Sequence, residues 1–223
     1  MKLTRDRILD AGMAAFGEAG FNGLSMRQVA EKLDVHAGSL YYHVANKDAL
    51  LALLADRVAL GAFDAGTVAL DALAPDASWT DRVIAQMTAL RISLLAHPGS
   101  AELLAASPGA LSPGALSIME RLLGTLDAAG VDDDRIVVAD ALLSYVTGFV
   151  LQEHAERRAP QPLPFDATYY ERFPQVLGPR PRFTKDEMFR RSLDLLCDAA
   201  AARRHTGRIV ANPPTAAPAG SPA

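Results

Sequence analysis

The sequence has few of the features that would place a protein outside the cell or in a membrane. Its 223 residues include a single cysteine, Cys197, so no disulfide can form within one chain, and a reducing cytoplasm fits best. The N-terminus lacks the long apolar stretch of a secretory signal. The most apolar run, residues 136–151, is interrupted by Asp140 and is too short to cross a bilayer comfortably. We therefore expect a cytoplasmic protein with no membrane contact, in which this run forms a buried helix.

Positive charge is also not in excess. The 22 lysines and arginines are outnumbered by 26 aspartates and glutamates, which gives a net charge of −4. Nucleic-acid-binding domains are usually basic, so the overall charge argues mildly against such a partner, and any nucleic-acid site must be local. The length and the 50% hydrophobic content are enough for one sizeable core, or for a small domain beside a larger one.

Alternating β-branched runs are absent too, and apolar residues recur every three to four positions along almost the whole chain. This pattern predicts an all-α fold. Expected helix caps are Thr4, Ser25, Asn46 and Ser112, while Gly20 should end the first helix and a tight turn should lie at Asp34. These signals place helices at about 4–18, 26–33, 37–43, 47–63, 80–97 (or from 79), 113–129, 132–158 and 185–203, with short pieces near 101–107 and 169–173. The predicted organisation is a small three-helix domain at 1–46, a connecting helix at 47–66, a larger helical domain at 67–205 and a disordered tail at 206–223.

What the sequence does contain is an unusual short helix within LDVHAGSLYYHVANKDALL, residues 33–51. Gly38 weakens this helix by about 1 kcal/mol relative to alanine, and few of its neighbours suit a core. Three short helices joined by tight turns, with a polar third one, are typical of a helix-turn-helix. Small residues let such a helix approach base edges, and hydroxyl, imidazole and lysine groups contact phosphates. The candidate DNA contacts are Ala37, Gly38, Ser39, Tyr41, Tyr42, His43 and Lys47. The alternative is that the paired tyrosines are half-buried packing residues.

Residues 4–58 closely resemble the DNA-binding domain of the TetR repressor family. The resemblance rests on the pattern GF.GLSMR.VA..L.V..GSLY.HV.NK..LL, which is far more specific than a general helix-turn-helix. It implies that the short helix reads double-stranded operator DNA, and it adds Ser25 and Arg27 to the expected DNA contacts.

A looser resemblance covers the rest of the chain. The patterns W..R......A.R..LLAHPG, SPGAL..ME.LL..L..AG and ALLSYVTGFVLQE look like the C-terminal domain of the tetracycline repressors and their actinobacterial relatives. This implies that residues 67–205 bind a small-molecule effector and form a homodimer, with the helices from about 132 and 185 pairing with their copies. Both helices have wide apolar faces: Ile136, Ala139, Leu143, Val146 and Val150 on the first, and Met188, Leu193, Leu195 and Leu196 on the second. The alternative is that these faces pack only within one subunit.

The same resemblance gives an expectation about metal. It places Leu104 where those repressors have a metal-binding histidine, Gln152 where they have an acid, and Phe63 where they have another histidine. Magnesium requires oxygen ligands, which Leu and Phe cannot supply, so we expect no metal, no cofactor and a largely apolar effector. The expected ligand contacts are Phe63, Gln86, Leu90, Leu104, Met119, Tyr145, Phe149 and Gln152.

The function implied is a ligand-responsive regulator, most simply a repressor released from a palindromic operator. An enzyme is the first alternative, but Cys197 has no histidine nearby in sequence, and the five histidines form no metal motif. A protein-binding module that has lost DNA binding is the second alternative. The presence of Arg27, Ser39, Tyr42 and Lys47 argues against it.

Overall fold

The computed structural model describes residues 2–106, 112–131, 133–158, 166–179 and 182–206, with side chains at 158 and 203–206 not described. Every described element is a helix, which confirms the all-α prediction. The helices are α1 (Arg5–Gly23), α2 (Met26–Leu33), α3 (Ala37–Leu40), α4 (Lys47–Asp71), α5 (Trp79–Leu95), α6 (Ser100–Ala105), α7 (Pro113–Ala128), α8 (Arg135–Arg158), α9 (Ala167–Arg172), α10 (Pro174–Leu177) and α11 (Lys185–Thr206). Residues 207–223 of the predicted tail lie outside the described residues.

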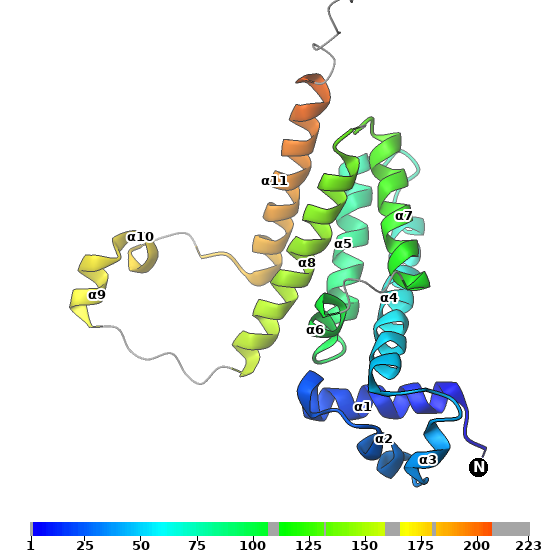
Figure 1. Ribbon diagram of the computed structural model, residues 1–223. Coiled ribbons are helices and arrows are strands. Elements are labelled where there is room, and N and C mark those ends of the chain that lie inside the picture. The colour runs from blue at the N-terminus through cyan, green and yellow to red at the C-terminus, as the bar shows by residue number, and fades with distance from the viewer. Residues whose placement is uncertain (1, 107–111, 132, 159–165, 180–181, 207–223) are drawn as a thin grey trace, which may run out of the picture.

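The helices form a small head and a larger body. Helices α1–α3 make up the head, at one end of the molecule, and α4 runs from the head into the body, where it lies beside α5 and α7 (Figure 1). Helices α8 and α11 complete the body, while α9 and α10 lie to one side of it (Figure 1). Since α4 belongs to both parts, a shift in the body can reach the head through one continuous helix.

Local capping explains where most helices begin. The side chains of Thr4, Ser25, Asn46 and Ser112 each accept a hydrogen bond from a backbone N–H in the first turn of α1, α2, α4 and α7. These four caps are as predicted from the sequence. Pro113 follows the last of them at the first helical position, where its missing N–H costs nothing.

Several helix boundaries differ from the predicted ones, and three of them bear on the head and on α4. Gly20, which is predicted to end α1, has φ 67° and interrupts the helix, but a further turn continues to Gly23. Helix α3 ends at Leu40, and residues 41–43 form a turn. Helix α4 runs on to Asp71 rather than ending near Phe63, and Gly66 lies inside it. A side chain at Gly66 would collide with the guanidinium of Arg121 on α7, so this glycine makes room for a neighbour instead of ending the helix.

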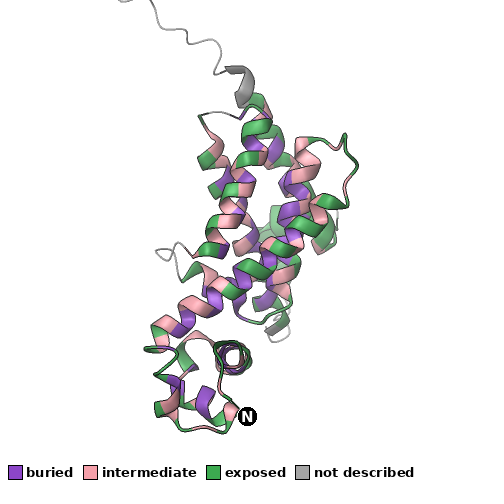
Figure 2. Cartoon of the chain, turned by 90° about the vertical axis from the view of Figure 1, so that its right-hand side faces the viewer, coloured by how far each residue is buried: buried purple, intermediate pink, exposed green. Residues whose placement is uncertain are grey.

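Two hydrophobic cores lie end to end. The head core includes Ile8, Phe16, Leu24, Leu40 and Leu50, and the body core includes Met87, Leu94, Leu122, Val146 and Leu193, all 2% exposed or less. Buried positions run along the inward face of each long helix (Figure 2).

The head and the body also meet away from α4. Met13 and Leu104 pack against both cores. A Cβ at Gly99, which has φ 83°, would stand 2.6 Å from the ring of Phe16. The turn before α6 is therefore a second contact between the body and the head.

Helix α8 is long and apolar enough to cross a membrane by length and composition, and it is the one helix of this kind among the described residues. It packs instead against α5, α6, α7 and α11. Its inward residues Ala139, Val146 and Val150 are buried in the body core, as is Leu193 of α11. The apolar faces predicted on these two helices are therefore divided, because Ile136, Met188 and Leu195 remain exposed while the others pack within the chain.

Candidate nucleic-acid interface and effector cavity

The surface of α3 and of the turn after it is open to solvent. The side chains of Tyr41 and Tyr42 are 52% and 91% exposed, and His43 is exposed as well. A Cβ added to Gly38 would meet no atom within 4 Å. Tyrosines that served only as packing residues would be covered by their own chain, so these aromatic side chains are available to a partner.

Buried neighbours hold this surface in position. Leu40 and Val44 lie in the head core, and the Val44 N–H donates to the Leu40 carbonyl at 2.9 Å. Asp34, with φ 53°, turns the chain between α2 and α3. Ala37 and Ser39 are half-buried, and Ala37 packs against the head core. Only the solvent-exposed part of each of these two residues is available for contact with DNA.

The start of α2 carries the other two expected DNA contacts. The Ser25 hydroxyl accepts from the Gln28 N–H and donates to the Gln28 Oε1 at 3.0 Å, so the helix cap already uses it. The Arg27 side chain is 85% exposed and forms an ion pair with Glu31 at 2.9 Å. Because an exposed pair one helical turn apart is weak, Arg27 can leave Glu31 for a stronger acceptor.

Lys47 is the first residue of α4. Its ammonium group donates to the Asn22 carbonyl at 3.4 Å, which places the charge beside the end of α1. The first N–H groups of a helix attract anions, and a lysine at the same position adds a full charge. This arrangement suits a phosphate group.

The excess of negative charge lies outside the head. Residues 1–47 contain six lysines and arginines against five aspartates and glutamates, whereas residues 48–223 contain 16 against 21. The acidic overall balance therefore arises outside the head, and it does not argue against a nucleic-acid partner there.

The body contains a cavity of about 600 Å³ between α4, α5, α6, α7 and α8. Its floor is apolar and includes Ala55, Ala59, Leu90 and Ile118, all buried. Small-molecule sites commonly have this size and an apolar lining. The described residues that line it are Ala52, Ala55, Ala59, Leu90, Leu104, Ala105, Ser112, Ala115, Ile118, Asp140, Leu143, Ser144, Thr147, Gly148 and Leu151.

Two of the eight expected ligand contacts, Leu90 and Leu104, line this cavity. The other six, which are Phe63, Gln86, Met119, Tyr145, Phe149 and Gln152, do not. Gln152 is exposed rather than inward-facing. The next residue along α8, Glu153, occupies the inward position instead and pairs with Arg91. The cavity itself is lined by Ser144, Gly148 and Leu151, each one position before an expected contact on α8.

Gln86 is buried as expected, but its amide is already satisfied. Its Nε2 donates to the Thr125 hydroxyl at 2.9 Å and to the Arg82 carbonyl at 3.1 Å, and its Oε1 accepts from Nε of Arg121 at 3.2 Å. A ligand would have to replace these partners. Gln86 therefore serves the contact between α5 and α7.

Arg91 and Glu153 form a buried ion pair that was not predicted from the sequence. Nε and Nη2 of Arg91 donate to the two carboxylate oxygens of Glu153, both at 2.8 Å, and Nη1 donates to Asp186 at 2.7 Å. These bonds to Glu153 raise the pKa of Arg91. The guanidinium also lies against the rings of Phe149 and Phe189. The group ties α5, α8 and the start of α11 together.

A signal for Arg91 was present in the sequence. It stands four residues after Met87 and three before Leu94, within the apolar stripe of its helix. Tyr145 stacks on the same aromatic cluster, and burial raises the pKa of its hydroxyl while Ser192 acts in the opposite direction. Tyr145 and Phe149 are therefore part of this packed group.

No three metal-ligating side chains come together among the described residues. Leu104 and Phe63 carry no ligating atom, and Gln152 is exposed. The positions at which the resemblance places metal ligands thus do not fit a magnesium ion.

Comparisons with known proteins agree with this architecture. Residues 8–54 match the family described as bacterial regulatory proteins, tetR family, and residues 73–200 match the tetracyclin repressor-like C-terminal domain. The chain belongs to the TetR family. This family consists of transcriptional regulators, not enzymes, and its N-terminal domain binds DNA.

Individual TetR relatives cover much of the chain. An HTH-type transcriptional regulator of Saccharopolyspora erythraea is 39% identical over 156 residues, which are 70% of this chain but 63% of that regulator. The structure of BioQ with its double-stranded DNA operator is 30% identical, with a TM-score of 0.65 over 90% of this chain and 99% of that one. The structure of ActR from Streptomyces coelicolor in complex with actinorhodin is 26% identical, with a TM-score of 0.71 over 92% and 99%.

Proposed function

We propose that this TetR-family chain is a homodimeric, cytoplasmic repressor that binds a palindromic operator and is released by a small, largely apolar effector. The exposed surface of α3 carries the proposal. Gly38 on α3 has open space around it, and the two tyrosines in the turn after α3 are uncovered. Nothing within the described part of the chain accounts for these features, whereas close approach to DNA does. The operator complex of the related BioQ supports it.

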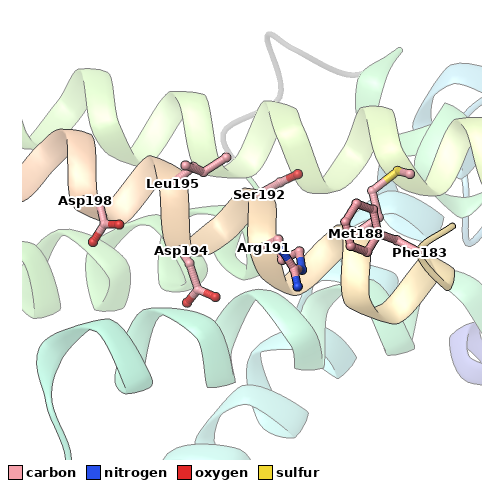
Figure 3. Close-up of a pocket in the computed structure, with 7 residues that line it drawn as sticks. All are labelled: Phe183, Met188, Arg191, Ser192, Asp194, Leu195 and Asp198. Carbon is pink, nitrogen blue, oxygen red and sulfur yellow. The ribbon is translucent and has the colours of Figure 1, made fainter. Parts of the chain in front are cut away.

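The dimer is supported by the apolar surface that α8 and α11 leave open. Ile136 and Val137 of α8 are 62% and 66% exposed, and Leu195 of α11 is 69% exposed. An open hollow of about 470 Å³ lies along α11, lined by Phe183, Met188, Arg191, Ser192, Asp194, Leu195 and Asp198 (Figure 3). A second copy would cover these residues and place two heads on successive major grooves, which a palindromic operator requires.

Release follows from the position of the cavity. Ala52, Ala55 and Ala59 of α4 line the cavity, and the same helix begins at Lys47, which is the expected phosphate contact. An effector that fits the cavity best when the heads are wrongly spaced shifts the population off DNA. A change from 1% to 99% released requires a preference of about 10⁴-fold between the two states.

Helix α7 strengthens this route. The Gly114 N–H donates to Asp56 Oδ1 of α4 at 2.8 Å, and a Cβ at Gly114 would stand 2.6 Å from the Leu60 nitrogen. The two helices therefore touch backbone to backbone and move together. An effector between α7 and α8 would act on α4 through this contact.

The deciding experiment is a gel shift with the purified protein and the DNA upstream of its own gene. We expect a complex that survives excess random competitor DNA, with two protein chains bound per operator. A protein-binding module would show no preference over the competitor. A monomer bound to one half-site would contradict the dimer but not the DNA-binding role.

A further inference from the structure

The cavity between α4, α7 and α8 has a polar rim over an apolar floor. Asp140 and Ser144 line it and are exposed, so they stand at its mouth, whereas Leu90 and Ile118 are buried at its base. Thr147, one turn further along α8, uses its hydroxyl hydrogen to bond the Leu143 carbonyl at 2.9 Å and keeps its lone pairs free to accept. A ligand of this cavity is therefore apolar at one end and meets hydrogen-bond acceptors at the other.

Asp140 is the one charged side chain among the described residues that line the cavity. It forms no ion pair or hydrogen bond with another described side chain, whereas Asp81 accepts from the Ser78 hydroxyl and Asp186 pairs with Arg91. The excess negative charge of residues 48–223 adds to its field. Both effects favour a cation at the mouth and oppose an anion.

The lining is also free of aromatic and basic side chains among the described residues. Recognition by ring stacking or by an arginine–carboxylate pair is therefore not available there. Alanine, leucine and isoleucine provide only apolar contact, and the polar selection falls to Asp140 and the hydroxyl groups near it.

From this geometry we propose that the cavity takes amphipathic cations, with the apolar part on the floor and a protonated amine beside Asp140. The role of such a ligand in release from DNA rests on the proposed function. Its binding to the cavity is independent of that function. Because Asp140 is exposed and screened, apolar contact supplies most of the affinity and Asp140 supplies the choice between charges.

The test compares two fluorescent probes with the same apolar group, pyrenebutylammonium and pyrenebutyrate, by titration of the full chain. We expect the ammonium probe to bind more tightly. Asp140→Asn should weaken the ammonium probe about threefold to fivefold and leave the carboxylate probe unchanged or tighter, in line with an exposed ion pair. The difference should shrink as salt is raised.

Two further variants locate the site. Gly148 lines the cavity, and a Cβ there would meet no atom within 4 Å. Gly148→Leu therefore starts a side chain in open space, occupies part of the cavity and should abolish specific binding of both probes. Asp71→Asn removes the same charge from an exposed position of α4 outside the lining and should change nothing.

Several outcomes would overturn the inference. These are equal binding of the two probes, no effect of Asp140→Asn, or unchanged binding in Gly148→Leu. A monomeric Asp140→Asn variant in analytical ultracentrifugation would also overturn the inference, because Asp140 would then belong to the contact between subunits. Gel shifts with the same probes test the binding site and the proposed release from DNA separately. If the protein prefers the ammonium probe but stays on DNA, the site is supported and its role as an effector site is contradicted.

Discussion

The guanidinium carbon of Arg121, on α7, lies 4.2 Å from the centroid of the Phe63 ring on α4. The same group donates through Nη1 to the Phe63 carbonyl at 2.7 Å and to the Thr67 hydroxyl at 2.8 Å. Burial lowers the pKa of Arg121, and nearby Asp64 acts against this. One side chain thus fastens the middle of α7 to the distal half of α4, beyond the cavity.

Arg121→Met should lower the free energy of unfolding by about 1–3 kcal/mol, because it leaves the buried Gln86 oxygen without its donor and removes the contact with Phe63. Urea unfolding measures this change against the wild type.

Gly66→Ala provides the control for that contact, since its Cβ would meet the guanidinium of Arg121. The alanine should be harmful in the wild type. In the Arg121→Met background it should be neutral or stabilising, because the guanidinium is gone and alanine favours a helix over glycine by about 1 kcal/mol. The same effect of Gly66→Ala in both backgrounds would show that the two residues do not interact.

Lys47→Ala should weaken binding to operator and to random DNA alike, because a phosphate contact carries no base information. The slope of log affinity against log salt should become shallower by about 2 for a dimer, one for each lost contact. Lys185→Ala is the matched control, since that lysine pairs with Glu156 in the body. A changed operator preference with an unchanged slope would mean that Lys47 reads bases.

Arg27→Ala should relax the preference at one base pair in each half-site, at a cost of about 1–3 kcal/mol for a lost bidentate contact with guanine. The base preference of each variant is measured by selecting bound sequences from a pool of randomised operators. Glu31→Ala frees Arg27 from its ion pair and removes a negative charge near the phosphates, so it should strengthen all DNA binding without altering the preferred sequence. An unchanged selected sequence for Arg27→Ala would rule out the base contact.

Cys197 should resist thiol reagents in the folded protein. Burial raises its pKa from an ordinary value of 9.0 to about 11, and the thiolate is the reactive form. At pH 8 a disulfide reagent should therefore react slowly with the native chain and rapidly in urea. Since the folded pKa is the higher one, the contribution of this thiol to stability is complete below pH 9 and is lost as the pH rises through about 11. Equal rates in native and unfolded protein would show that the thiol is accessible.

The sequence by itself determined the head. Caps at Thr4, Ser25 and Asn46, and the turn at Asp34, depend on residues no more than a few positions apart, so they can be recognised without knowing what packs against them. The exposure of Tyr42 was not fixed in this way, because the pattern left open that the paired tyrosines pack against the core, and the structure shows that Tyr42 is 91% exposed.

The tertiary structure decided how the helices of the body are turned toward one another. Arg91 and Glu153 are 62 positions apart in the chain, and Phe16 meets Gly99 across the junction of head and body. The cavity is lined by Ser144 and Thr147 of α8 rather than by Tyr145 and Phe149. A helix with apolar residues on more than one side can face its neighbours in several rotations, and only the close packing of all its partners at once selects one of them.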